Sequence, residues 1–279
     1  MKRLPALLPL AAAALAVSCS SRPTAPDFGE RSVDTLLRHG AASCRVEYRF
    51  ATIRNADASE ALRTIEQANI GYFFELEEFS GTPTEAADSA LHEIARECLP
   101  DLPERAEAPV YEIAVESQGT VVDTLLTYVI VRSSYLGGAH GSYATNYHNY
   151  SLRDGYELCT ADLFTPEQLQ EIDRRIRLKL LEQYDATDDE GLAAAGFFPD
   201  YITATENFLV TPYGITFHYN PYEIGCYALG AVEVEFSTGE LNEVRAPGHP
   251  APPPPPPPPP RGGPAAPPPP PHKKKKKNP

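Results

Sequence analysis

The stretch Tyr135-Leu136-Gly137-Gly138-Ala139-His140-Gly141 places two adjacent glycines before a histidine, between two segments with strand patterns. Because glycine adopts positive φ readily, we expect a tight turn here, held by hydrogen bonds from His140 to backbone groups. A second stretch, Pro221-Tyr222-Glu223-Ile224-Gly225-Cys226-Tyr227-Ala228-Leu229-Gly230, follows later in the chain. Neither stretch contains a catalytic signature, so together they indicate a fold family more than a reaction.

The segments around these stretches predict an α+β fold. Alternation of apolar and polar residues predicts strands, and alanine, leucine and glutamate at helical spacing predict helices. Thr82 and Thr165, each followed by proline, are typical helix starts. Because helices and strands are segregated, we expect an antiparallel sheet with helices packed on one side. The expected strands are 44–53, 110–116 and 121–133 (joined at Gln118-Gly119), 143–151, 208–210, 214–219 and 231–236; the expected helices are 58–78, 84–98 and 166–184, with a solvated turn at 188–190.

The two ends of the chain differ in composition from the segment between them. Residues 1–18 have a basic start and a short, proline-interrupted apolar run, which is typical of a signal peptide. The sequence before Cys19 is similar to a bacterial lipobox and predicts a lipid on Cys19, which would anchor the protein to the inner or outer membrane, facing the periplasm or cell surface. The alternative is cleavage after Ala16, which leaves a soluble periplasmic protein. We expect a tether over 19–42, an N-terminal part with one strand and two helices over 43–108, a C-terminal α+β domain over 109–245, and a disordered tail rich in proline and lysine over 246–279.

Four cysteines remain if Cys19 carries lipid, and an even number in an oxidising compartment favours disulfides. Four cysteines allow three connectivities, which the sequence leaves open. We favour Cys44 with Cys98 and Cys159 with Cys226, because each pair lies within one predicted half of the chain. Metal binding is the alternative, but no paired Cys/His spacing supports it, so we expect neither a metal nor another cofactor.

The charge of the chain is strongly acidic outside its two ends. All 38 acidic residues precede the proline tract, and eight of the 24 basic ones lie at the ends: Lys2, Arg3, Arg261 and Lys273 to Lys277. The remaining 16 basic residues give the body a formal charge of −22 against those 38 acidic ones. Such a surface repels nucleic acid and anionic lipid, so we expect no nucleic-acid partner and membrane contact through the N-terminal lipid alone. Solubility is the simplest role of this charge, and attraction of a cationic partner is the other.

The order of several motifs resembles the RsiV/PdaC-like family of extracytoplasmic domains. The resemblance covers about Cys44 to Leu241, is densest after Val110, and includes these motifs: Tyr135 to Gly141, Tyr156, Asp162-Leu163-Phe164 and the run from Leu209 to Gly225. Members include the extracellular part of a lysozyme-sensing anti-sigma factor and the non-catalytic region of a peptidoglycan deacetylase. The family usually has proline where this chain has Cys226.

The resemblance implies a non-enzymatic envelope domain that binds a lysozyme-like cationic protein or peptidoglycan glycan. The alternative is a peptidoglycan-modifying deacetylase or hydrolase with an unrecognised site, and an assembly role is a third hypothesis. The candidate ligand-binding residues are Tyr135, His140, Tyr219, Tyr222 and Glu223. Aromatic rings with a polar tip suit sugar stacking or protein contacts, although packing in the closing strands is the other interpretation for Tyr219, Tyr222 and Tyr227. We expect no catalytic residue; a metal or acid–base site formed by His140, His148 and His218 with Glu223 is the alternative.

Overall fold

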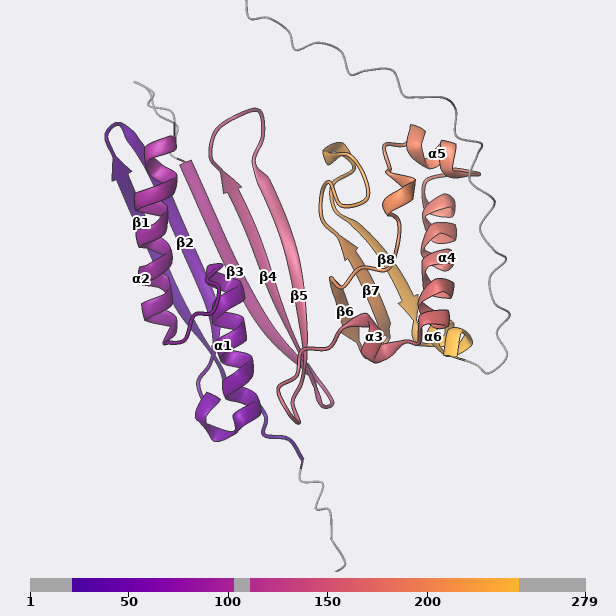
Figure 1. Cartoon of the computed structure of the whole chain (residues 1–279), viewed down its shortest axis with the longest axis horizontal. Helices are drawn as coiled ribbons and strands as arrows, with labels where there is room; N and C mark the ends of the chain where they lie inside the picture. Colours follow the sequence, from indigo (N-terminus) through magenta and orange to yellow (C-terminus); the bar gives the residue numbers. More distant parts are fainter. Residues whose placement is uncertain (1–21, 103–110, 246–279) are drawn as a thin grey trace, which may run out of the picture.

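The structure is a computed structural model that describes residues 22–102 and 111–245 and has an α+β fold with two sheets (Figure 1). The predicted signal peptide, the lipidation site Cys19 and the predicted tail over 246–279 lie outside the described residues. Within the described ranges, none of the helices is long and apolar enough to cross a membrane.

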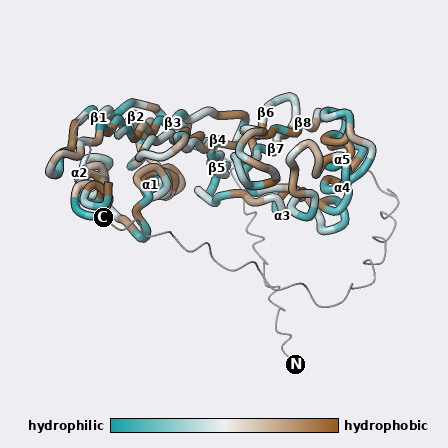
Figure 2. The backbone as a smooth tube through the Cα atoms, turned by 90° about the horizontal axis from the view of Figure 1, so that it is seen from above, coloured by the Kyte–Doolittle hydropathy of each residue, from teal (hydrophilic) through white to brown (hydrophobic). Residues whose placement is uncertain are grey.

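The first sheet has five strands in the order β1-β2-β3-β4-β5. Helices α1 and α2 connect β2 to β3 and lie on one side of this sheet (Figure 2). A crossover of this kind returns the chain in the same direction, and β2 and β3 are indeed parallel, whereas the other neighbours are antiparallel. The predicted α+β fold with helices on one side of the sheet is confirmed, and the predicted antiparallel sheet is corrected to a mixed one at the β2–β3 pair. The bounds are β1 Phe28–His39, β2 Ala42–Ile53, α1 Glu60–Phe74, α2 Pro83–Glu93, β3 Tyr111–Val122, β4 Leu125–Tyr135 and β5 Ser142–Ser151, with short helical turns at Ala56–Ala58, Ile94–Cys98 and Leu99–Asp101.

Strand β1 occupies half of the segment 19–42, for which the sequence predicted a tether. Its residues pair with the whole of β2, from Phe28 opposite Ile53 to His39 opposite Ala42. Val33 and Leu37 pack against the first core, while Asp34 and Leu36 between them are exposed. Only residues before β1 therefore remain available as a tether.

The turn between β3 and β4 lies after Val122, not at Gln118-Gly119 as the sequence analysis expected. Asp123 adopts φ 55° in this turn. Gly119 lies inside β3 opposite Tyr128, and a Cβ atom there would clash with the ring of Phe28. Gly119 thus makes room for an aromatic ring of β1 instead of forming a turn.

The second half has a three-stranded antiparallel sheet in the order β6-β7-β8 and its own hydrophobic core. Helix α4 begins as predicted, because the Thr165 side chain accepts a hydrogen bond from the Gln168 amide and Pro166 is the first helical residue. Asp188 caps helix α5, so residues 188–190 begin a helix and are not a solvated turn. The bounds are α3 Thr160–Leu163, α4 Pro166–Gln183, α5 Asp189–Ala194, β6 Phe208–Thr211, β7 Gly214–Tyr219, β8 Val232–Ser237 and α6 Thr238–Arg245, with short helical turns at Pro199–Tyr201 and Tyr227–Leu229.

Asparagine side chains join the two halves along the outer edge of β5. The Asn207 and Asn220 carboxamides both accept from and donate to the β5 backbone: Tyr147 N donates to Asn207 Oδ1 at 2.8 Å, and Thr145 N donates to Asn220 Oδ1 at 2.7 Å. Both amide nitrogens donate to Thr145 O, at 2.8 and 3.1 Å. Asn149, which is 1% exposed, donates from β5 to Phe208 O at 2.8 Å. These side-chain amides hydrogen-bond backbone N–H and C=O groups on the outer side of the edge strand β5, which would otherwise lack partners in a sheet.

The four described cysteines are free thiols, so the two predicted disulfides are absent from the structure. Cys44 is buried in β2, and burial raises the pKa of its thiol to about 11, with Cys98 adding to the shift. A thiol with such a pKa stays protonated at neutral pH and reacts slowly in disulfide exchange. Cys159 donates to Asp162 Oδ2 at 3.2 Å at the start of α3, and Cys226 packs against Gly196. Cys159 and Cys226 thus contact different residues, and they do not form the predicted disulfide.

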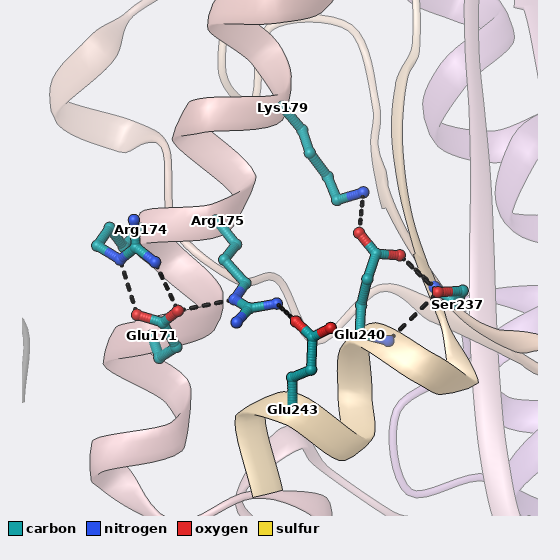
Figure 3. A network of polar contacts seen from close by, with 7 residues as sticks. All are labelled: Glu171, Arg174, Arg175, Lys179, Ser237, Glu240 and Glu243. Atoms are coloured by element: carbon teal, nitrogen blue, oxygen red, sulfur yellow. Dashed lines mark hydrogen bonds and ion pairs between the residues drawn. The ribbon is translucent and has the colours of Figure 1, made fainter. Parts of the chain in front are cut away.

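A polar network joins α4 to α6 and to the end of β8 (Figure 3). Glu171 on α4 accepts hydrogen bonds from Arg174 at 2.6 and 2.7 Å and from Arg175 at 2.7 Å. Arg175 also donates to Glu243 on α6 at 3.0 Å. Lys179 contacts Glu240 at 2.5 Å, and Glu240 accepts from the amide and hydroxyl of Ser237 at 2.8 and 2.7 Å.

We expect Glu240→Gln to lower the free energy of unfolding at pH 7 by about 1 kcal/mol, since the Lys179–Glu240 pair is about one-third exposed and solvent screens it. Burial alone would raise the pKa of Glu240, but hydrogen bonds from Lys179 and Ser237 outweigh it and lower the pKa to about 2. Because the folded pKa lies below 4.5, the ordinary value for glutamate, this stabilisation is complete above pH 4.5 and is lost as the pH falls towards 2.

The measurement is urea unfolding of both proteins between pH 7 and pH 2. Glu235→Gln is the matched control, because it removes the same charge from an exposed side chain on β8. A difference between Glu240→Gln and the natural protein that stays constant over this pH range would contradict the assignment.

Candidate functional site

The two sequence stretches quoted first come together in the structure around Tyr227. The Tyr227 hydroxyl donates to Gly141 O at 2.9 Å, across the boundary between the two halves. His140 stacks on the Tyr227 ring with centroids 4.0 Å apart and an interplanar angle of 18°. Tyr222 and Tyr143 lie beside the same ring, at centroid distances of 5.6 and 6.1 Å. We call His140, Tyr143, Tyr222 and Tyr227 the tyrosine patch.

The loop between β4 and β5 forms one side of the tyrosine patch, and it is the tight turn that the sequence predicted. Gly137 and Gly138 have φ of 94° and 101°. A Cβ atom at Gly141 would lie 2.7 Å from Ser134 O, so only glycine fits there. His140 Nδ1 donates to Gly141 O at 2.8 Å, which leaves Nε2 of the neutral ring as an acceptor.

The loop after β7 forms the other side of the tyrosine patch, and backbone hydrogen bonds to Gly196 and Phe198 hold it in place. Ile224 is buried, and Ile224 O accepts from Phe198 N at 2.8 Å. Cys226 N donates to Gly196 O at 2.9 Å. Tyr222 has φ 74° and is 60% exposed. A tyrosine held in the left-handed region is strained, and the Tyr222 ring stays largely exposed although it lies beside Tyr227.

The other predicted ligand-binding residues have structural roles. Tyr219 is 2% exposed and its hydroxyl donates to Thr203 O at 2.7 Å, so its side chain belongs to the core and is not available to a ligand. Glu223 accepts from the Asn220 amide at 3.0 Å and from Asn220 Nδ2 at 3.3 Å, and thereby orients the side chain that binds β5. The Tyr135 hydroxyl donates to Gly138 O at 3.3 Å within its own loop.

The histidines that the sequence offered as a metal or acid–base site do not converge. His148 Nδ1 contacts Glu157 at 2.8 Å, His218 Nδ1 contacts Glu233 at 2.9 Å, and His140 belongs to the tyrosine patch. Across residues 22–102 and 111–245, no group of three His, Cys, Asp or Glu side chains is arranged to hold a metal ion. The structure therefore corrects the alternative of a three-histidine site with Glu223.

The sequence analysis identified His140 and Tyr222 as candidate ligand-binding residues but did not identify Tyr143. For Tyr227 it left two interpretations open, contact with a ligand and packing in the core. Tyr143 is 43% exposed at the start of β5. Its position just after the glycine-rich turn was visible in the sequence, but its approach to Tyr227 depends on the contact between the two halves. The patch offers exposed aromatic faces and phenol groups, which suit binding.

One protein-family model matches a segment that contains part of this site. Residues 161–238 match the family model described as "Protein of unknown function (DUF3298)". This segment includes Tyr222 and Tyr227. Among proteins with curated descriptions, none matches the chain.

Two solved structures are similar to this one. A member of the DUF3298 family from Bacteroides fragilis NCTC 9343 is 24% identical, with a TM-score of 0.69 over 80% of this chain and 94% of that chain. A DUF3298 family protein from Pseudomonas aeruginosa PAO1 is 15% identical, with a TM-score of 0.57 over 79% of this chain and 94% of that chain. These likenesses show the fold. Residues 161–238 of the chain therefore match the DUF3298 family model, and the chain shares its fold with solved DUF3298 family proteins.

Proposed function

We propose that this protein is a non-enzymatic binding protein of the cell envelope whose tyrosine patch contacts a cationic, lysozyme-like protein. The observation that carries the proposal is the convergence of four exposed or half-buried rings from two distant segments on a fixed backbone. Tyrosine is enriched at the energetic centres of protein interfaces, because it buries a large rigid ring and keeps a polar tip.

The charge of the body supports a cationic partner. The 16 basic residues between the two chain ends stand against 38 acidic ones, a formal charge of −22. A field of this sign accelerates the approach of a basic protein and disfavours acidic ones.

The resemblance to the RsiV/PdaC-like family supports the same assignment, since one member of that family senses lysozyme, and it is compatible with the DUF3298 match. The N-terminal sequence supports an envelope location, with Cys19 as the lipid attachment point. Peptidoglycan fragments are the other ligand that the family suggests, and the exposed rings would also suit sugar stacking.

The test is calorimetric titration of the purified protein with lysozyme at low ionic strength and at about 0.15 M, where charges are screened beyond about 8 Å. We expect saturable binding that weakens as salt rises. Lysozyme with acetylated lysines is the matched control and should bind more weakly.

Two results would contradict this proposal. Equal affinity for native and acetylated lysozyme at both salt concentrations would remove the electrostatic argument. Saturable binding of soluble peptidoglycan fragments without binding of lysozyme would assign the patch to a glycan.

A further inference from the structure

A pocket of about 660 Å³ lies at the C-terminal end of α1, away from the tyrosine patch residues. Arg132 of β4 and Asn146 and His148 of β5 line it from the sheet, and Tyr72 of α1 and Phe79 line it from the helical layer. In Figure 1, α1 and α2 lie in front of the first strands of the sheet. The volume falls within the range of small-molecule sites, about 300 to 1,000 Å³.

The walls of this pocket are held by hydrogen bonds within the protein. Gln67 donates to Gly81 O at 2.9 Å and accepts from Gly81 N at 3.1 Å, which ties the segment after α1 back onto the helix. Arg132 donates to Phe73 O at 2.8 Å and also to Tyr72 O. These carbonyls lie in the last turn of α1, where helical partners are missing. These hydrogen bonds hold the end of α1 against β4 and the segment after α1 against the helix.

The charge of the pocket is negative because its single arginine is already engaged. Arg132 Nε lies 3.4 Å from the Glu75 carboxylate, in addition to the helix carbonyls that its Nη2 binds. Glu77 and Glu78 also line the pocket and are exposed. Neither has an ion-pair partner among the residues that the structure describes, so two carboxylates remain for a ligand.

An aromatic wall completes the pocket. The Tyr72 and His148 rings stack with centroids 4.0 Å apart and an interplanar angle of 14°. The Tyr72 hydroxyl and His148 Nδ1 each contact one oxygen of Glu157 at 2.8 Å, which fixes both rings. Tyr72 remains 43% exposed. An exposed tyrosine ring beside carboxylates attracts guanidinium and ammonium groups.

We propose that this pocket binds a guanidinium or primary ammonium group, held between the Glu77 and Glu78 carboxylates and the Tyr72 ring. The proposal goes beyond the function assigned to the tyrosine patch and does not rest on it. It concerns one cationic group and its alkyl chain, not a protein surface.

The test is an NMR titration of the ¹⁵N-labelled protein with agmatine, which carries both cationic groups on an alkyl chain. We expect saturable shifts of backbone amides around Tyr72 and Glu77 to Phe79. The double variant Glu77→Gln/Glu78→Gln should bind agmatine about tenfold more weakly, because two partly screened ion pairs are lost. The matched control Glu182→Gln/Glu190→Gln removes the same charge from exposed glutamates in the second half of the molecule and should keep the affinity.

Two further probes separate the possible sources of the cation. Binding of capped N-acetylarginine amide as well as agmatine would assign the pocket to arginine side chains of a peptide, and binding of agmatine alone would assign it to a free small amine. The proposal is overturned by the absence of saturable shifts with agmatine, by equal losses in both double variants, or by equal affinity for neutral butyramide.

Discussion

Tyr222→Gly is expected to stabilise the folded protein and to weaken its binding to lysozyme. Tyr222 has φ 74°, a conformation that costs a residue with a side chain about 1 to 2 kcal/mol and costs glycine almost nothing. Glycine also has more freedom in the unfolded chain, so we expect a net gain of about 1 kcal/mol in the free energy of unfolding.

The same change removes the most exposed tyrosine ring of the tyrosine patch. Truncation of a tyrosine at an interface centre costs about 2 kcal/mol, so the dissociation constant should rise about thirtyfold. Urea unfolding measures the free energy of unfolding, and calorimetric titration with lysozyme measures the dissociation constant. Tyr213→Ala is the control, because Tyr213 is 83% exposed in the β6–β7 turn and should leave lysozyme binding unchanged. Unchanged binding in Tyr222→Gly would show that the strained tyrosine does not contact the partner.

Phe217→Ala is expected to lower the free energy of unfolding by about 4 kcal/mol, because it opens a cavity in the second core. The Phe217 ring is 0% exposed and packs edge-on against Phe236, with centroids 5.7 Å apart, and lies 6.4 Å from Phe208. Phe217→Leu keeps most of the volume and should cost less than about 1.5 kcal/mol.

Circular dichroism during urea unfolding measures this effect. Tyr213→Ala again serves as control, since truncation of this exposed side chain should change stability by less than about 0.5 kcal/mol. A loss below about 1 kcal/mol in Phe217→Ala would mean that β6, β7 and β8 do not enclose the core that supports Tyr222 and Tyr227.

Helices α1, α2 and α4 were predicted well from the sequence because their signals are local, whereas the shorter α3, α5 and α6 were not predicted. Thr82 and Thr165 each accept a hydrogen bond from the amide three residues later, and each is followed by proline at the first helical position. These features depend on four consecutive residues. The α+β class followed from the same local patterns.

Strand pairing was less predictable because it joins distant residues. Cys44 lies opposite Tyr111 in the parallel pair of β2 and β3, and no pattern within either strand specifies that partner. Gly119 shows the same limit: its local signal suggested a turn, but its role is to accommodate Phe28, which is far away in the sequence. The two predicted disulfides were wrong for the same reason, because whether two cysteines meet depends on how distant segments are placed.

Only part of the candidate site was predictable from the sequence, because the rest depends on contacts between residues that are distant in the chain. The glycine turn around His140 and the exposed Tyr222 carried local signals, whereas the junction of Tyr227 with Gly141 required the two halves to meet along β5. Tyr219 could not be separated from the surface tyrosines by sequence, because its burial arises from packing in the second core.

The central claim is that the tyrosine patch is the surface that binds a cationic protein, and amide hydrogen exchange of the protein alone and with lysozyme tests it most directly. The proposal predicts slower exchange in two segments, 136–143 and 222–230, when lysozyme is bound. Binding with slower exchange confined to other segments would contradict the claim.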